Sequence, residues 1–193
     1  MKSREVIPEA SPLTLEGSFT RDLVISKLWL LDTLAALDAP RFHTAYILGS
    51  WYGNLSLFMI ARRMPVDHIV NVDRGRWLPA SRKLAQRLGM DHSIEYMRAD
   101  ANDLDYRQAQ PPSIVINTSV NDMPNAGWLD AVPPGTWVAV QGRNHVAPGA
   151  ANDYASLAEF DRAYPMSQTL SLDSIELEDP EVKYSRWMKI GIK

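Results

Sequence analysis

Hydrophobic and polar positions change their period along the chain, and this pattern predicts the elements. Between residues 23 and 37, six leucine and isoleucine side chains recur at helical spacing, so a helix with a broad apolar face is expected there. Thr20 is expected at its N-cap, Asp22 in its first turn, and Pro40 beyond its end. Residues 1 to about 15, with two prolines, are expected to form an extended arm.

From residue 44 onward, short apolar runs alternate with helical patterns. Buried strands are expected at residues 44–48, 68–72, 94–97, 114–117 and 136–141. Helices are expected at residues 54–63, 78–88, 128–132 and 153–164. The last two segments, 167–177 and 184–192, are both extended and are joined by residues 178–181, which is typical of an antiparallel hairpin.

The alternation predicts an α/β fold. It is Rossmann-like and doubly wound, with a mostly parallel sheet that has helices on both faces and an antiparallel hairpin at its C-terminal end. Because no repeat or linker divides the chain, residues 1–193 are expected to form a single domain. In this prediction residues 1–40 supply the arm and first helix, and residues 41–193 form the Rossmann-like core.

Two glycines follow the first expected strand at the point where it ends. Gly49 and Gly53 flank a short loop, and the next helix is expected to begin directly after it. Glycine lets the backbone approach a ligand closely, and a helix start offers free amide donors. Asp73 ends the second expected strand twenty positions after Gly53, where a carboxylate can hold the hydroxyls of a ribose. The pattern therefore predicts a nucleotide-binding crevice.

This order of elements and the glycine loop resemble the class I S-adenosylmethionine-dependent methyltransferases. The resemblance implies a seven-stranded sheet whose last strand is antiparallel, with S-adenosyl-L-methionine lying across the carboxyl ends of the early strands. It implies that Gly49 and Gly53 pass beneath the methionine and ribose portions, and that Asp73 binds the ribose hydroxyls. Asp100 and Ala101, after the third strand, match the segment that meets the adenine amine.

The resemblance extends to two further parts of the site. Asn117, which ends the fourth strand, matches a position that often faces the transferable group. Within the loop itself, Ser50, Trp51 and Tyr52 are also expected to contact the cofactor. Trp51 stands where the family has its middle glycine, so its indole could cover the cofactor or form a wall of the substrate pocket. Ile47 stands where the family frequently has an acidic residue.

The same loop argues against two other nucleotide sites. The fingerprint of NAD-binding folds needs a second glycine at position 51, and this chain has Trp51 instead. A phosphate loop of the Walker type needs Gly-Lys-Ser or Gly-Lys-Thr, which the sequence lacks. NAD is therefore the less favoured alternative, since an acidic residue at the end of strand two suits any ribose.

A polar cluster after the fourth strand is a candidate for the acceptor side. The cluster spans residues 117–123, and its members Asn117 and Asp122 are expected to be catalytic residues. The alternative is a turn in which Asn and Asp side chains bond their own backbone.

A second polar cluster, at residues 141–145, follows the fifth expected strand. Arg143 and Asn144 are candidate substrate-binding residues, because an arginine can hold a carboxylate or phosphate on the acceptor. His145 is a candidate for accepting a proton. A solvated loop is the alternative for this cluster.

Composition narrows the possible partners. The chain of 193 residues is 46% apolar, has a net charge of −3 and contains no cysteine. Disulfides and thiolate metal sites are therefore excluded, and no ligand spacing predicts another metal site. The sequence lacks both an apolar signal segment and a run long enough to span a bilayer, so a cytoplasmic protein without membrane partners is expected. The basic residues between 74 and 87 are expected to be a solvated helix surface.

We therefore expect a methyltransferase acting on a small molecule, since no appended recognition domain is apparent. Nucleic acid is a less favoured acceptor, because only Asn117 agrees with the Asn-Pro-Pro-Tyr/Phe motif of base-modifying relatives. Other chemistry on the same sulfonium, such as aminocarboxypropyl transfer or lyase cleavage, is a further alternative. A non-catalytic nucleotide-binding subunit is another. The acceptor and the oligomeric state stay open at this stage.

Overall fold

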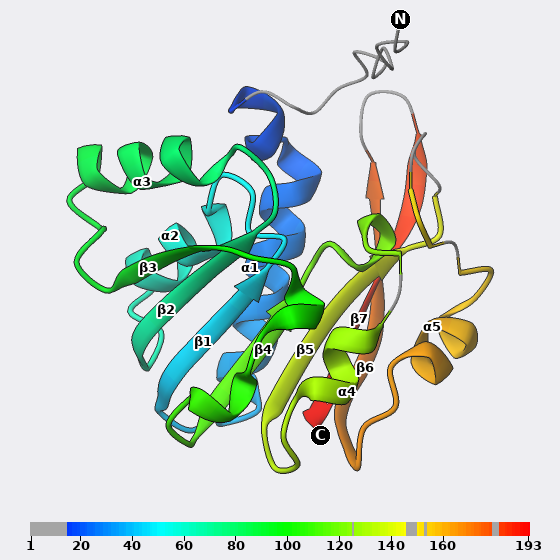
Figure 1. The fold of residues 1–193 in the computed structure, drawn as a ribbon. Helices are drawn as coiled ribbons and strands as arrows, with labels where there is room; N and C mark the ends of the chain where they lie inside the picture. Colours follow the sequence, from blue (N-terminus) through cyan, green and yellow to red (C-terminus); the bar gives the residue numbers. More distant parts are fainter. Residues whose placement is uncertain (1–14, 125, 146–149, 153, 179–181) are drawn as a thin grey trace, which may run out of the picture.

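The chain folds around a single mixed sheet (Figure 1). The structure is a computed structural model that describes residues 15–124, 126–145, 150–152, 154–178 and 182–193. Within these residues the sheet has seven strands in the order β3-β2-β1-β4-β5-β7-β6. Strands β1 to β5 are parallel, while β7 runs antiparallel between β5 and β6. The expected fold class is confirmed.

The strands lie close to the positions that hydrophobicity predicted. They are β1 (Phe42–Leu48), β2 (Val66–Asp73), β3 (Ile94–Arg98), β4 (Ser113–Asn117), β5 (Trp137–Arg143), β6 (Gln168–Glu178) and β7 (Lys183–Ile192). The end of β5 differs from the prediction. It continues beyond Gln141 to Arg143, because residues 141–143 pair with residues 186–188 of the hairpin strand β7.

The helices are short except for the first. They are α1 (Arg21–Ala36), α2 (Asn54–Ala61), α3 (Leu78–Arg87), α4 (Gly127–Ala131) and α5 (Leu157–Ala163). Helix α5 was expected to begin at Asp153, which lies outside the described residues. It begins later because Ser156 caps it: the Ser156 hydroxyl accepts from the Glu159 amide, and the Glu159 carboxylate accepts from the Ala155 amide.

Helices cover both faces of the sheet and enclose two hydrophobic cores. On one face, Leu30, Leu31 and Leu34 of α1 pack with α2 side chains against Ile47 and Ile116. On the other face, α4 and α5 contribute a group of large aromatic side chains to the second core, namely Trp128, Phe160 and Tyr164. Because successive strand residues point to opposite faces, each buried parallel strand supplies both cores.

All five parallel strands end on the same side of the sheet, which we call the carboxyl edge. It consists of residues 49–54, 73–77, 99–103, 117–123 and 143–145, and the opposite ends of the strands form the amino edge. The start of α1 also lies at the carboxyl edge, since the Asn54 amide donates to the carbonyl of Ser18 just before this helix. The arm predicted for residues 1–15 lies outside the described residues except for Leu15. None of the helices described is long and apolar enough to cross a membrane.

Candidate cofactor and acceptor site

The glycine loop between β1 and α2 adopts the left-handed conformation at three positions. The φ angles are +61° at Gly49, +56° at Trp51 and +75° at Gly53. A Cβ atom on Gly49 would lie 2.8 Å from the Ser119 Cβ, and one on Gly53 would overlap the Ser81 hydroxyl. Glycine is therefore needed at both positions, because the backbone is left-handed there and because a side chain would meet its neighbours.

Asp73 holds this loop against the turn that follows β2. Its Oδ2 accepts a hydrogen bond of 2.9 Å from the Trp51 amide, and its Oδ1 accepts one of 2.6 Å from the Gly75 amide. The first bond fastens Trp51 in a left-handed conformation that is costly for a residue with a side chain. The carboxylate thus lies beside the loop, as its spacing predicted, and its oxygens retain lone pairs for a ligand.

Two buried oxygen atoms next to this loop lack a hydrogen-bond partner among the described residues. They are the hydroxyl of Ser50 and Oδ1 of Asn54. Buried polar atoms are nearly always paired, and leaving one unpaired costs about 1–3 kcal/mol. A polar ligand at the loop would remove that cost. These oxygens, with the glycine positions and Asp73, fit a nucleoside cofactor that carries hydroxyl and amino groups.

Aromatic rings form a row from the loop toward the turn after β2. The Tyr52 ring is buried, and its centroid lies 6.4 Å from that of Trp51 and 5.5 Å from that of Trp77. The guanidinium of Arg76 lies 5.1 Å from the Trp77 ring centroid. Trp77 was missed by the sequence analysis, although its place four residues after Asp73 puts it on the same turn.

Asp100 and Ala101 follow β3, which is the strand next to β2, and they lie at the same carboxyl edge. Asp100 caps the short turn η2 (Ala101–Asp103) by accepting from the Asn102 amide, and it pairs with Arg74 at 3.0 Å. The hydrogen bond from Asn102, followed by the Arg74 charge, holds the Asp100 pKa below its ordinary value. Ala101 is buried. Their contact with an adenine amine stays a prediction.

Asn117 is fully buried and organises the turn after β4. Its Oδ1 accepts from the Ser119 amide at 3.0 Å, and its Nδ2 donates to the Met123 sulfur at 3.1 Å. The hydroxyl of Ser119 in turn donates to the Gly49 carbonyl, which brings this turn against the glycine loop. Asp122 lies on the exposed side of the same segment. Asn117 therefore bonds to the backbone of its own turn, as the turn alternative in the sequence analysis predicted. This turn lies next to the glycine loop.

The three candidates that follow Gly142 are arranged differently from one another. Arg143 is half-buried as the last residue of β5 rather than in the loop after it, which corrects the prediction. The Asn144 amide faces the hairpin, where its Oδ1 accepts from the Ser185 amide at 2.8 Å. His145 is half-buried at the end of this segment. All three stay candidates for the acceptor, and Asn144 in addition connects the end of β5 to β7.

Two buried residues that were not among the predicted site residues connect the strand ends. Asn121 binds the backbone of Arg143 through both its oxygen (3.0 Å) and its nitrogen (3.2 Å), and so couples the turn after β4 to the end of β5. Arg186 on β7 is only 5% exposed and donates to the Thr118 carbonyl at 2.7 Å. The sequence did offer a signal for Arg186, since an arginine is unusual within an apolar strand pattern.

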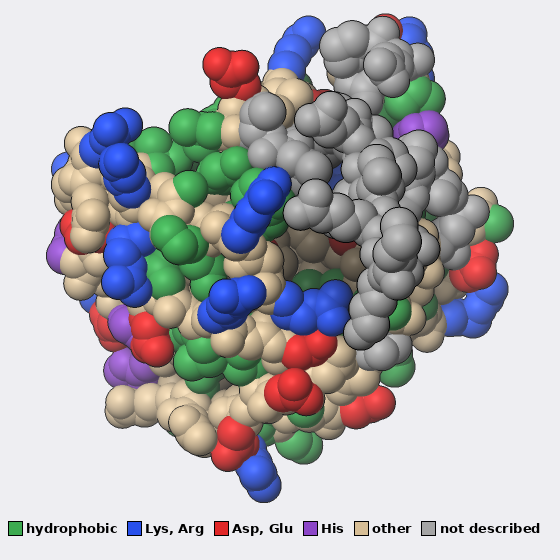
Figure 2. Space-filling view, turned by 45° about the horizontal axis from the view of Figure 1, so that its top comes forward, with side chains coloured by type: hydrophobic (Ala, Val, Ile, Leu, Met, Phe, Trp, Pro, Cys, Tyr) green, Lys and Arg blue, Asp and Glu red, His purple; other side chains and the backbone are tan. Residues whose placement is uncertain are grey.

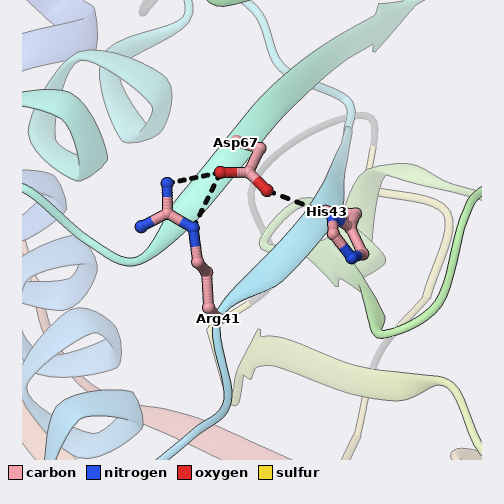
Figure 3. A network of polar contacts seen from close by, with 3 residues as sticks. All are labelled: Arg41, His43 and Asp67. Atoms are coloured by element: carbon pink, nitrogen blue, oxygen red, sulfur yellow. Dashed lines mark hydrogen bonds and ion pairs between the residues drawn. The ribbon is translucent and has the colours of Figure 1, made fainter.

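The carboxyl edge is hollowed, whereas the amino edge shows polar contacts of another kind. Figure 2 shows the hollow beside hydrophobic and basic side chains. At the amino edge, Arg41 and His43 both contact the carboxylate of Asp67, at 2.8 Å and 3.1 Å, and all three side chains are exposed to solvent (Figure 3). The Arg41 guanidinium lowers the Asp67 pKa, with a smaller contribution from His43.

A cavity of about 310 Å³ also lies at the amino edge, between α1 and α2. Leu34, Phe42 and Met59 supply much of its apolar wall, and Arg62 and Arg63 lie at its border. None of the predicted site residues lines it. No group of three metal-ligating side chains occurs among the residues described by the structure.

No protein-family model matches this sequence, and neither does any curated protein. Solved structures do share its fold. A Galdieria sulphuraria protein assigned as a sarcosine dimethylglycine methyltransferase is 11% identical, with a TM-score of 0.67 over 89% of this chain and 86% of its own. The N-methyltransferase NodS from Bradyrhizobium japonicum, solved with S-adenosyl-L-homocysteine, is 9% identical, with a TM-score of 0.64 over 94% and 93%.

An rRNA methylase from Streptococcus thermophilus is also similar, at 13% identity and a TM-score of 0.57 over 91% of this chain and 99% of its own. At such identities the likeness concerns the fold. The chain therefore has the fold of the class I S-adenosylmethionine-dependent methyltransferases, as the sequence resemblance implied.

Proposed function

We propose that this chain, which has the class I methyltransferase fold, binds S-adenosyl-L-methionine and methylates a small molecule. The observation that carries the proposal is the hydrogen bond that Asp73 accepts from the left-handed loop, beside the unpaired oxygens of Ser50 and Asn54. A carboxylate, a close backbone and unpaired acceptors are the groups that a ribose and an amino-acid moiety would use.

In this proposal each part of the loop has a separate task. Asp73 accepts hydrogen bonds from the ribose hydroxyls while it keeps its bonds to the Trp51 and Gly75 amides. Gly49 and Gly53 leave room for the cofactor to approach the backbone. Ser50 and Asn54 accept from polar hydrogens of the cofactor. The rings of Trp51 and Tyr52 cover the apolar parts of the cofactor.

When bound, the cofactor supplies an electrophilic methyl group on a sulfonium. The chain's own residues then have to align the acceptor and exclude water, and alignment can contribute about 7–11 kcal/mol to catalysis. Asn117 serves as a positioning residue, since its buried amide holds the turn against Gly49 through Ser119. Asp122 or His145 takes a proton from an acceptor that arrives protonated, which contributes about 10²–10⁴-fold.

Calorimetric titration with S-adenosylmethionine, S-adenosylhomocysteine and NAD tests the cofactor. Wild type is expected to bind both sulfur nucleotides at micromolar concentration and to bind NAD at least a hundredfold more weakly. Asp73→Asn should weaken binding tenfold or more. Asp67→Asn, at the other end of the same strand, is the matched control and should leave binding unchanged. If neither sulfur nucleotide binds wild type, the proposal fails.

The products distinguish methyl transfer from the alternatives. Mass spectrometry of the spent cofactor should find S-adenosylhomocysteine, whereas methylthioadenosine would indicate aminocarboxypropyl transfer or cleavage. Because one solved structure of this fold is an rRNA methylase, RNA and DNA are also tested as acceptors. Retention of nucleic acid that weakens steeply with salt, together with label in the nucleic acid, would replace the small molecule in this proposal.

A further inference from the structure

Three basic side chains lie near one another between α1 and the C-terminal hairpin, because the charge of Arg186 acts on Lys27 and the charge of Arg143 acts on Arg186. Lys27 belongs to α1, Arg143 to β5 and Arg186 to β7, and we call them the cation cluster. Arg143 and Arg186 are direct partners in the antiparallel pairing, so they lie on the same face of the sheet. That face is covered by α1, because Gln141, two residues before Arg143, exchanges two hydrogen bonds of 2.9 Å with Ser26.

Carboxylates offset the charges of the cation cluster only in part, since Asp22 acts on Lys27 and Arg186 without forming an ion pair with either. Among the described residues, none of its three side chains forms an ion pair. Arg186 is only 5% exposed, and its Nε atom has no hydrogen-bond partner in the described structure. The nearby buried carboxylate of Asp22 is bonded to the Tyr184 hydroxyl at 2.5 Å instead.

Burial and mutual repulsion make this arrangement costly. Burial, followed by the Arg186 charge, lowers the pKa of Lys27 to about 8, although Asp22 opposes the change. Burial likewise lowers the pKa of Arg186 to about 10, and the charge of Arg143 contributes, while Tyr184, Asp122 and Asp22 oppose it. Like charges that face each other across a strand pair destabilise a sheet. A bound anion would convert this repulsion into attraction.

The cation cluster borders the acceptor side of the proposed methyltransferase site. Arg186 donates to the carbonyl of Thr118, and the next residue, Ser119, donates to the carbonyl of Gly49 in the glycine loop. An acceptor bound by the cation cluster would therefore lie close to the glycine loop that is proposed to bind the cofactor.

We propose that the acceptor is a small molecule with a carboxylate or phosphate group, and that Lys27, Arg143 and Arg186 bind this group. The inference rests on the proposed function, since it names the substrate class of the same site. A guanidinium offers paired donors that match the oxygens of either anion, and Arg186 has a free donor of this kind. Its burial favours a small anion over the phosphates of a nucleic acid, which are met by exposed side chains.

Thermal unfolding of the purified chain in inorganic phosphate or succinate, against sodium chloride of equal ionic strength, tests the anion site. Either anion is expected to raise the Tm of wild type in a saturable way. Lys27→Met and Arg143→Met should each raise the apparent dissociation constant tenfold or more. Lys83→Met, on the exposed surface of α3, is the control and should bind as wild type does. Arg186→Lys should retain charge but bind phosphate more weakly.

Several outcomes would overturn the inference. These are no effect beyond chloride, equal stabilisation of wild type and both methionine variants, or tight binding of single-stranded RNA that depends on Lys27 and Arg143. Calorimetry with S-adenosylhomocysteine on the same variants separates the two proposals. If the nucleotide binds and the anions do not, only the anion site fails. If the anions bind and the nucleotide does not, the cluster is an anion site but its role toward a methyl acceptor falls.

Discussion

The two ends of strand β2 each carry an aspartate, and the two carboxylates are used differently. Asp67, at the amino edge, contacts the side chains of Arg41 and His43 in water (Figure 3). Asp73, at the carboxyl edge, is half-buried and accepts from the backbone amides of Trp51 and Gly75. Exposed ion pairs contribute little because water screens them, whereas an acceptor for backbone amides determines the path of the chain.

The same contrast holds for the neighbouring polar groups. At the carboxyl edge, Ser50 and Asn54 bury unpaired oxygens and Arg186 buries an unpaired nitrogen. The amino edge has the cavity of about 310 Å³, yet its walls are mainly apolar. A cavity alone therefore does not locate the site in this molecule. The unpaired atoms of Ser50, Asn54 and Arg186 favour the carboxyl edge, because each is a cost that a ligand there could remove, whereas those of Asn71, Tyr96 and Trp128 lie within β2, β3 and α4.

The largest effect is expected from adding a methyl group to a glycine at the carboxyl edge. Gly53→Ala should destabilise the chain by about 2–5 kcal/mol, because the new Cβ meets Ser81 and the left-handed φ also becomes costly. Binding of S-adenosylhomocysteine should be lost. Urea unfolding and calorimetry measure the two effects.

Gly89, at the end of α3 toward the amino edge, provides the matched control for this prediction. Its φ is +67°, but a Cβ there would meet nothing within 4 Å. Gly89→Ala should therefore cost only about 1–2 kcal/mol, from backbone conformation alone, and should leave nucleotide binding intact. Equal losses of stability in the two variants would show that packing at Gly53 is unimportant.

A second contrast concerns two lysines on opposite faces of the hairpin region. Lys27 lacks a described ion-pair partner, whereas Lys189 on β7 pairs with Asp161 at 2.6 Å and donates to the Tyr164 carbonyl at 2.9 Å. Lys27→Met should stabilise the chain by about 1–3 kcal/mol at pH 7, since it removes a charge that burial disfavours. Lys189→Met should destabilise it by a similar amount, because it leaves its acceptors unpaired.

The effect at Lys27 should depend on pH with a definite sign. Its pKa is about 8 in the folded chain, against 10.5 for an ordinary lysine, so between these values the unfolded chain binds more protons. The free energy of unfolding of wild type should therefore rise with pH relative to that of Lys27→Met, from about pH 8 upward. Denaturant titrations between pH 7 and 10 measure this difference. A gap that stays constant over this range would contradict the burial of a charged Lys27.

Local signals predicted most of the fold. The apolar runs placed β1 to β4, and the lack of a helix before the last strand placed the hairpin. The pairing of Asp73 with the glycine loop was predictable for the same reason, since both lie at the ends of adjacent parallel strands. The late start of α5 also had a local signal, because Ser156 and Glu159 form the spacing of a capping box.

The cation cluster had no such signal. Arg143 and Arg186 meet only because β7 pairs with β5 in one particular register, and a shift by one residue would turn Arg186 to the other face. That register depends on contacts between distant segments. The packing of α1 against the sheet, which brings Lys27 near the two arginines, depends on such contacts too. Single residues in the sequence could therefore suggest the glycine loop but not the proposed anion site.

The smallest expected effect comes from two residues other than glycine that have a left-handed backbone, one at each edge. Trp51 has a φ of +56° at the carboxyl edge, and Arg63 has a φ of +54° after α2 at the amino edge. Replacing either by glycine removes conformational strain, and Arg63→Gly should raise the free energy of unfolding by about 1 kcal/mol. Trp51→Gly should gain less, because the indole contact with Tyr52 is lost.

Ligand binding separates these two variants further. Arg63→Gly should leave the dissociation constant of S-adenosylhomocysteine unchanged, whereas Trp51→Gly should raise it several-fold, because the proposed cover over the cofactor is gone. Calorimetry of both variants beside wild type measures this. If Trp51→Gly binds more tightly, the indole obstructs the site rather than covering it. The backbone bond from Trp51 to Asp73, which glycine can also make, would then be the feature of this residue that serves the cofactor.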